Sequence, residues 1–248
     1  MTQAIATAAI LIIGNEILSG RTRDANVAFL GAELAARGIT LAEVRIVRDD
    51  SDAIVAALNE LRRHFTYVFT SGGIGPTHDD ITSAAVASAF GVALKRNPEA
   101  EACLRTRYAA NEMNAARLKM ADIPQGATLI DNPVSQAPGF RLDNVFVLAG
   151  VPRILQAMFD GIKGGLAGGP PQHSRSITLA AREGDLAEGL AAIQTAHPET
   201  EIGSYPSFTE GRSLVTVVAR GTDPAMLDNV LAETRALAVR LRAAVLDP

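Results

Sequence analysis

The residues from Phe69 to Asp80 have the types and spacing best suited to phosphate chemistry in this chain. The apolar run Tyr67–Phe69 predicts a buried strand, and three glycines, Gly72, Gly73 and Gly75, follow it closely. α/β proteins bind phosphates where a strand ends in a glycine loop that leads into a helix, because backbone N–H groups can then approach the anion. The predicted phosphate-binding loop consists of Ser71, Gly72, Gly73, Gly75, Pro76 and Thr77.

Two aspartates, Asp79 and Asp80, follow this loop and add negative charge to the predicted site. Carboxylates repel a phosphate, so their presence is explained by a divalent cation between the two groups. For one of the two, Asp80, a purely structural role would also explain the carboxylate, because Thr77 followed three residues later by Asp80 resembles a helix capping box. No lysine follows the glycines and no G-x-G-x-x-G pattern is present, which excludes a Walker loop and a dinucleotide fingerprint.

Other turns supply further candidate ligands. Gly14, Asn15 and Glu16 follow the first apolar strand, where ligands bind in open α/β sheets, although the same residues fit an ordinary turn. Asp49 follows the second strand and could bind a cation or belong to a solvated loop, with Asp52 favoured as a helix cap. Asp24 could cap a helix or contact a ribose or metal.

The later part of the chain adds turns and two cations. Asn132, Pro138, Gly139 and Gly150 lie in turns that could be walls of a cleft or simple connections. Arg117 and Lys119 are the best basic candidates for binding a phosphate or carboxylate, although a solvated side chain is the ordinary state of a single lysine.

These residues must be positioned by alternating strands and helices. Strands are expected at 8–13, 41–47, 67–70 and 145–148, and helices at 25–37, 54–65, 78–90, 99–116 and 154–162. This alternation predicts an α/β fold with a mostly parallel sheet covered by helices on both faces. Residues 121–144, rich in Pro, Gly and Asn, are expected to be irregular.

A glycine- and proline-rich stretch, 164–171, is typical of a linker and divides the chain into domains at 1–168 and 169–248. The pattern of the second part predicts a small α+β domain with the element order β-α-β-β-α. Its strands are expected at 176–181, 201–205 and 213–219, and its helices at 186–196 and 224–245.

Composition narrows the functional class. The chain of 248 residues carries a net charge of −4 and no basic stripe, which argues against nucleic-acid binding. No apolar run approaches the roughly 20 residues of a membrane span, and we see no signal peptide. A single cysteine, Cys103, excludes an internal disulfide framework, so a cytoplasmic location is expected.

Several motifs together resemble a known family. They are GNEILSG (14–20), DAN (24–26), VRDD (47–50), TSGGIGPTHDDIT (70–82), RLKMADIP (117–124), NPVSQAPGF (132–140), LAGVP (148–152) and IGSYPSF (202–208). The chain resembles the MoaB/Mog molybdopterin-binding fold, and more closely the N-terminal part of the CinA (competence/damage-inducible protein A) family. It is also similar to the molybdopterin-binding-like domain of FAD synthases. The resemblance implies a three-layer α/β/α domain with its ligand site over the glycine loop, and self-association into a homo-oligomer.

The resemblance also implies chemistry. CinA-type domains are associated with metal-dependent pyrophosphatase action on ADP-ribose, FAD-synthase-type domains with hydrolysis of FAD, and other relatives with binding or adenylylating molybdopterin. Two departures stand out: Ala149 replaces a proline, and Ile154 stands where the family has glutamate. Asn15 stands where an aspartate is common.

Our leading hypothesis is a nucleotide diphosphatase that uses Co²⁺, Ni²⁺ or Mg²⁺. Backbone N–H groups of Gly72, Gly73 and Gly75 would hold the diphosphate, and Asp79 or Asp80 with Asp49 would hold the cation. Arg117 or Lys119 would stabilise the transferred charge. The alternatives are a protein that binds or adenylylates molybdopterin with ATP, and a silent module that binds a nucleotide without turnover.

Overall fold

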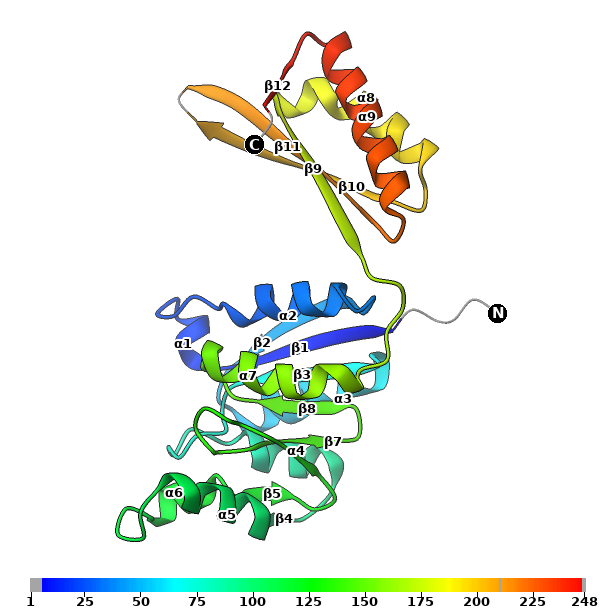
Figure 1. The fold of residues 1–248 in the computed structure, drawn as a ribbon. Coiled ribbons are helices and arrows are strands. Elements are labelled where there is room, and N and C mark those ends of the chain that lie inside the picture. The colour runs from blue at the N-terminus through cyan, green and yellow to red at the C-terminus, as the bar shows by residue number, and fades with distance from the viewer. Residues whose placement is uncertain (1–5, 210, 247–248) are drawn as a thin grey trace. The chain divides into compact units, whose positions relative to one another are not determined.

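The computed structural model describes residues 6–209 and 211–246 (Figure 1). The chain separates after Gly169 into two compact units. Each unit has its own sheet and its own apolar core, so each is described by itself.

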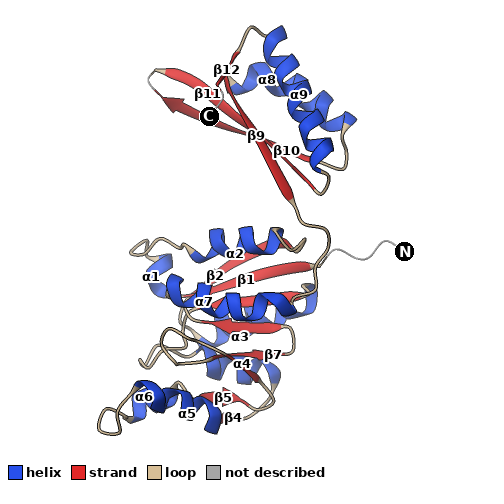
Figure 2. Cartoon of the chain, in the orientation of Figure 1, coloured by secondary structure: helices blue, strands red, loops and turns tan. Residues whose placement is uncertain are grey.

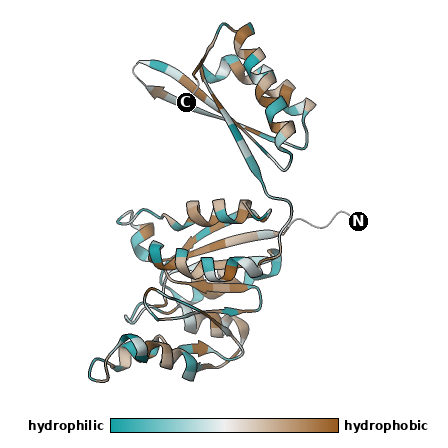
Figure 3. Ribbon diagram, in the orientation of Figure 1, coloured by the Kyte–Doolittle hydropathy of each residue, from teal (hydrophilic) through white to brown (hydrophobic). Residues whose placement is uncertain are grey.

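The N-terminal unit is built on a six-stranded sheet in the order β2-β1-β3-β8-β7-β6. The four strands β2 (Thr40–Val47), β1 (Thr7–Ile13), β3 (Tyr67–Ser71) and β8 (Val145–Leu148) run parallel. Strands β7 (Gly139–Leu142) and β6 (Thr128–Ile130) continue the sheet in antiparallel pairing (Figure 2). β8 is apolar along its whole length (Figure 3), as expected for a strand covered on both faces.

Helices cover both faces of this sheet, which confirms the three-layer α/β fold. Helices α3 (Ser51–His64) and α4 (Thr82–Phe90) pack on one face, where Leu58 and Val86 join Leu11 and Val68 in a common core. Helices α2 (Asn26–Ala35) and α7 (Pro152–Ile162) pack on the other, where Leu30 and Phe159 meet Ile10 and Phe69. A short helix, α1 (Asn15–Leu18), follows β1, and a single turn of 3₁₀ helix (Lys163–Gly165) follows α7.

Three predicted segments are corrected by the structure. The helix expected at 78–90 begins only at Thr82, because residues 77–80 form a separate turn. The helix expected at 99–116 is divided into α5 (Pro98–Arg107) and α6 (Ala115–Lys119), since Tyr108 takes an extended conformation. Residues 121–144 are not irregular: they contain β5 (Asp122–Pro124) as well as β6 and β7.

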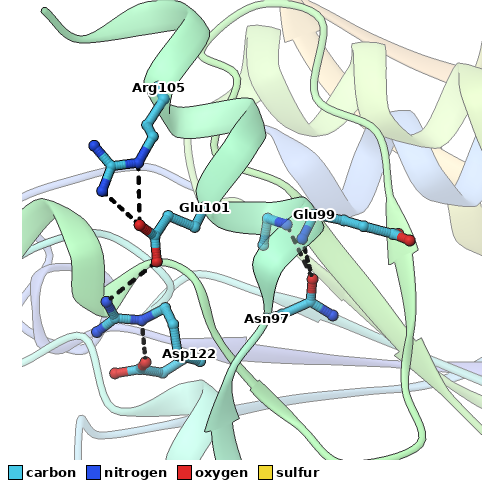
Figure 4. Close-up of polar contacts among 7 residues, drawn as sticks. Asn97, Glu99, Glu101, Arg105 and Asp122 are labelled. Atoms are coloured by element: carbon cyan, nitrogen blue, oxygen red, sulfur yellow. Dashed lines mark hydrogen bonds and ion pairs between the residues drawn. The ribbon is translucent and has the colours of Figure 1, made fainter. Parts of the chain in front are cut away.

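The segment around α5 is held by polar contacts that Figure 4 shows. The side chain of Asn97 accepts hydrogen bonds from the backbone N–H groups of Glu99 and Ala100, which caps the helix. Strand β4 (Leu94–Arg96) pairs with β5, and Arg96 Nε lies 2.7 Å from Asp122 Oδ1. These contacts hold the two-stranded β4–β5 sheet and α5 together. Since α4 packs on β5, this group of elements lies beside α4.

The C-terminal unit is a two-layer α+β domain. Its antiparallel sheet has the order β10-β11-β9-β12, with strands at Glu201–Thr209, Arg212–Gly221, His173–Ala180 and Ala244–Leu246. Helices α8 (Glu183–Ala196) and α9 (Pro224–Arg240) bury their apolar sides against it. The helix predicted at 224–245 therefore ends early, since Arg242 has a positive φ and the chain then forms β12. In the described part of the chain, no helix is long and apolar enough to cross a membrane.

Candidate functional site

A cavity of about 560 Å³ lies where β1, β2, β3 and β8 end. Its walls come from residues within 13–16, 72–80, 132–137 and 149–154, together with Thr22, Asp49, Tyr108 and Met120. The strand order reverses at β1, because β2 lies on one side of it and β3 on the other. Ligands of open α/β sheets bind at such switch points, and the volume is typical of a small-molecule pocket.

The base of the glycine loop, Gly72 and Gly73, is packed against the sheet. Gly72 has φ +105° and Gly73 φ +71°, and an added Cβ would overlap the Ile13 carbonyl oxygen or the Thr82 hydroxyl respectively. The Gly72 N–H donates to the Leu148 carbonyl at 3.2 Å. The Gly72 N–H therefore already has a protein acceptor, so it is not one of the free donors that face the cavity.

Thr82, at the start of α4, fastens the loop base from the other side. Its hydroxyl donates to the Gly72 carbonyl at 2.9 Å, and its N–H donates to the Gly73 carbonyl at the same distance. Thr82 is fully buried, so these hydrogen bonds are shielded from water. The two loop glycines are thus fixed by the fold before any ligand is present.

The tip of the loop is open. Within the described residues, the N–H groups of Gly73, Ile74 and Gly75 donate to no protein acceptor, and all three residues line the cavity. Successive free N–H groups in a turn are a recognised anion-binding arrangement. The phosphate-binding role predicted for the loop stays a prediction, and these three N–H groups are the donors free to perform it.

The two aspartates after the tip differ in their surroundings. Asp80 Oδ2 accepts from the Thr77 N–H at 2.8 Å and from the Thr77 hydroxyl at 2.5 Å, so this carboxylate closes a turn. Asp79 is exposed and lines the cavity. The pKa of the Asp79 carboxyl is lowered first by the nearby Thr77 hydroxyl, although that hydroxyl donates its hydrogen bond to Asp80, and then by the backbone N–H of Asp79, so Asp79 is ionised at neutral pH.

The predicted basic residues, Arg117 and Lys119, lie outside the cavity lining, and both side chains contact backbone carbonyls of the protein. Lys119 Nζ donates to the Thr77 carbonyl at 2.7 Å and so holds the loop from behind. The Arg117 guanidinium lies 4.3 Å from the centre of the Tyr108 ring and donates to the Glu112 carbonyl. Tyr108, which the sequence did not single out, does line the cavity.

Asp49 and Glu16 bring two more carboxylates to the cavity lining. Asp49 Oδ2 accepts from the Asn15 N–H at 2.8 Å, while Asn15 itself lies outside the lining. No three His, Cys, Asp or Glu side chains among the described residues are grouped as metal ligands. The predicted set of Asp49, Asp79 and Asp80 is therefore not a preformed three-ligand centre.

The loop 132–137 forms another wall and is ordered by Asn132, which is only 2% exposed. Its Nδ2 donates to Ser135 Oγ at 2.7 Å and to the Ala137 carbonyl at 2.8 Å, so the amide shapes the wall rather than facing a ligand. Pro138 and Gly139 lie outside the lining. A Cβ on Gly139 would overlap the Val147 carbonyl oxygen, so this glycine serves strand packing.

The turn after β8 supplies the last wall. Gly150 lies against the loop base, where an added Cβ would come 3.2 Å from Gly72 Cα. Ile154, in the first turn of α7, lines the cavity at the position where the resemblance leads us to expect glutamate. Ser71, predicted to contact phosphate, is buried outside the lining, and its hydroxyl accepts from the Asn26 side chain.

Two of the open helix-cap assignments are resolved. Asp24 Oδ1 accepts from the Val27 N–H at 2.8 Å, which is a capping contact at the start of α2. Asp50, rather than Asp52, caps α3 by accepting from the Ala53 N–H at 2.9 Å.

Comparison with known proteins agrees with this architecture. Residues 9–166 match the family described as the probable molybdopterin binding domain. The chain belongs to this family. Residues 171–241 match the FAD synthase middle domain, so both units have family counterparts.

Individual relatives narrow the family to its CinA-like members. A protein of Pyrobaculum calidifontis is 35% identical over 215 residues, which cover 82% of each chain. A CinA-like protein of Desulfosudis oleivorans is 36% identical over 82% of this chain, which spans about half (52%) of that relative. A crystal structure titled the protein CinA with unknown function, from Thermoplasma acidophilum, aligns with a TM-score of 0.62 and 34% identity. It covers 66% of this chain and 99% of its own.

Proposed function

We propose that the N-terminal unit is a metal-dependent nucleotide diphosphatase acting on substrates such as ADP-ribose or FAD. One observation carries the proposal: the ionised Asp79 carboxylate and the free N–H groups of the glycine-loop tip line the same cavity. An anion receptor beside a carboxylate is an unfavourable combination unless a cation joins the two.

The N–H groups of Gly73, Ile74 and Gly75 would bind the oxygens of the diphosphate. Asp79 and Asp49 would each offer a carboxylate oxygen to a Mg²⁺, Co²⁺ or Ni²⁺ ion, with the ligand's phosphates completing the coordination. Magnesium is commonly held in this way by one or two carboxylates and substrate phosphates, so the lack of a three-ligand group fits the assignment. When bound, such an ion polarises the phosphoryl oxygen and lowers the pKa of a coordinated water.

The cavity also supports a nucleotide rather than a bare diphosphate. Tyr108, Met120 and Ala137 line it from the segment between α5 and β7, whereas Glu16 and Asp49 line it from the turns after β1 and β2. A flat heterocycle would bind on the apolar and aromatic side of the cavity. The diphosphate and its cation would then lie between that side and the carboxylates.

The test is a hydrolysis panel on the full chain. ADP-ribose, FAD, NAD and ATP are each incubated with Mg²⁺, Co²⁺ or Ni²⁺, and with EDTA, and the products are separated by chromatography. Release of AMP from ADP-ribose or FAD that EDTA abolishes is the expected result. Normal turnover by a folded Asp79→Asn variant would contradict the assignment of Asp79.

A second candidate is binding or adenylylation of molybdopterin, because the family matched by residues 9–166 is described as a probable molybdopterin binding domain. The same loop tip would bind the phosphate of the pterin, or of ATP. A reaction that needs both ATP and a pterin dithiolene, without release of AMP by water alone, would favour this function over the diphosphatase.

A third candidate is a module that binds a nucleotide without turnover. It is favoured by Ile154, an apolar side chain that lines the cavity where the resemblance leads us to expect glutamate. If the wild-type chain binds ADP-ribose but does not hydrolyse it, the double variant Ala149→Pro, Ile154→Glu should restore turnover. Continued inactivity of that variant would place the defect elsewhere in the site.

A further inference from the structure

Asn26 is a buried side chain that the proposed chemistry does not use. It is the first residue of α2, is 3% exposed, and lies outside the cavity lining. Its Nδ2 donates two hydrogen bonds, to Ser71 Oγ at 2.9 Å and to the Gly150 carbonyl at 2.8 Å. Its Oδ1 has no partner among the described residues. One amide thus joins three segments that are far apart in the sequence.

The two acceptors lie at the carboxyl ends of β3 and β8, where the pairing of these two strands ends. Ser71 is the last residue of β3 and pairs with Leu148, the last residue of β8. Beyond this pair the two strands continue into separate walls of the cavity: the glycine loop after Ser71, and the turn with Val151 and Pro152 after β8. Asn26 is the side chain that bridges them just past the end of the strand ladder.

We infer that Asn26 is a positioning residue that sets the separation between the glycine-loop tip and the turn after β8. The inference rests on the proposed function to the extent that a diphosphate is the ligand held between these walls. Without the bridge, the connection of the Gly150 turn to the loop base would consist, among the described residues, of the hydrogen bond from Gly72 to Leu148 and of backbone packing. A displacement of about 1 Å in a catalytic site can lower the rate by about a hundredfold.

The chain contains a matched control in Asn144. Its Nδ2 also donates two hydrogen bonds, in this case to the backbone carbonyls of Arg62 and Phe65, each at 2.9 Å. Its Oδ1 is also buried without a partner. Asn144 precedes β8, at the amino end of that strand, and is not part of the cavity lining. Asn26→Ala and Asn144→Ala therefore remove the same kind of bridge from opposite ends of one sheet.

Hydrogen exchange of the full chain tests the inference without any ligand. Asn26→Ala should raise amide exchange in peptides covering 72–80 and 149–154 at least about tenfold over wild type, whereas Asn144→Ala should leave those peptides within about twofold. If Asn26→Ala does not fold, Ser71→Ala serves instead, since it removes one of the two acceptors and should give a smaller increase in the same peptides. Equal exchange in these peptides for the Asn26 and Asn144 variants would overturn the inference.

Turnover of ADP-ribose with Mg²⁺, Co²⁺ or Ni²⁺ gives the second readout, at a temperature where every variant is folded. Asn26→Ala should lower kcat/KM by about a hundredfold through kcat as well as KM, and Asn144→Ala by less than about threefold. Equal losses in both variants would mean that Asn26 has only a general structural role. A wild-type chain inactive on every substrate would refute the proposed function, while the exchange experiment would still decide the role of Asn26.

Discussion

The base and the tip of the glycine loop are adjacent in sequence but have different surroundings. Gly72 and Gly73 at the base adopt positive φ values and touch Ile13 and Thr82, so the fold itself requires them to be glycine. The tip, Ile74 and Gly75, lines the cavity, and its backbone N–H groups, like that of Gly73, have no protein acceptor in the described structure. A glycine-rich motif therefore combines residues needed for folding with residues left free for a ligand, and substitutions can separate the two roles.

The largest effect is expected from Gly73→Ala at the base. The variant combines an unfavourable φ with overlap of the buried Thr82 hydroxyl, and we expect a loss of about 3 kcal/mol in the free energy of unfolding. Gly20→Ala is the control, because Gly20 has a similar φ of +72° but no atom within 4 Å of the added Cβ. The control should lose only about 1 kcal/mol. Urea denaturation measures both, and equal losses would show that contact with Thr82 is unimportant.

The next effect is expected just after the tip, from Asp79→Asn. It should lower turnover of the best substrate about a hundredfold and leave the urea midpoint unchanged, because the Asp79 carboxylate is exposed. Asp80→Asn keeps an oxygen that can accept from Thr77, so it should lower stability by less than about 1 kcal/mol and turnover only a few-fold. The reverse order of the two activities would assign the ligand contact to Asp80.

A smaller effect is expected from Lys119→Met, which removes the hydrogen bond to the Thr77 carbonyl while keeping much of the side-chain length. Because Lys119 holds the loop without lining the cavity, KM should rise about three- to tenfold, with a stability loss of about 1 kcal/mol. Steady-state kinetics and urea denaturation measure the two quantities. Loss of kcat alone would instead indicate that Lys119 acts on the reacting phosphate.

The smallest functional effect is expected from Asp24→Ala. It removes the carboxylate that accepts from the Val27 N–H, and loss of such a helix cap costs about 1 kcal/mol of stability. Turnover at a temperature where the protein is folded should not change. A large loss of ligand affinity would revive the alternative that Asp24 contacts a ribose or a metal.

Much of the architecture could be predicted from the sequence. The apolar runs of β1, β3 and β8 stand out because both faces of these strands are covered, and the glycine loop was recognisable by its position after a buried strand. The family assignment from the quoted motifs is confirmed by the match of residues 9–166. Short strands such as β5 and β6, with three residues each, gave no comparable signal.

The finer features of the site could not be predicted because they depend on tertiary contacts. The spacing of Thr77 and Asp80 indicated the pairing that the structure shows, but it could not show that both aspartates line the cavity with only Asp79 left outside this turn. Lys119 was expected to bind a phosphate or carboxylate, but only the tertiary fold shows that its ammonium group contacts the Thr77 carbonyl, 42 positions earlier in the chain. Tyr108 was overlooked because it fell in the middle of the helix predicted at 99–116, whereas the structure ends α5 at Arg107 and places Tyr108 in the cavity lining.

The hydrogen bond from Lys119 to the Thr77 carbonyl has a consequence for the thermodynamics of binding. Together with Thr82 and Asp80, it fixes both ends of the glycine loop, at Gly72–Gly73 and at Thr77, in the ligand-free chain. Much of the conformational entropy of the loop is therefore lost when the protein folds, so little further ordering is required when a ligand arrives. Association should then proceed in a single kinetic phase, with a rate that rises linearly with ligand concentration.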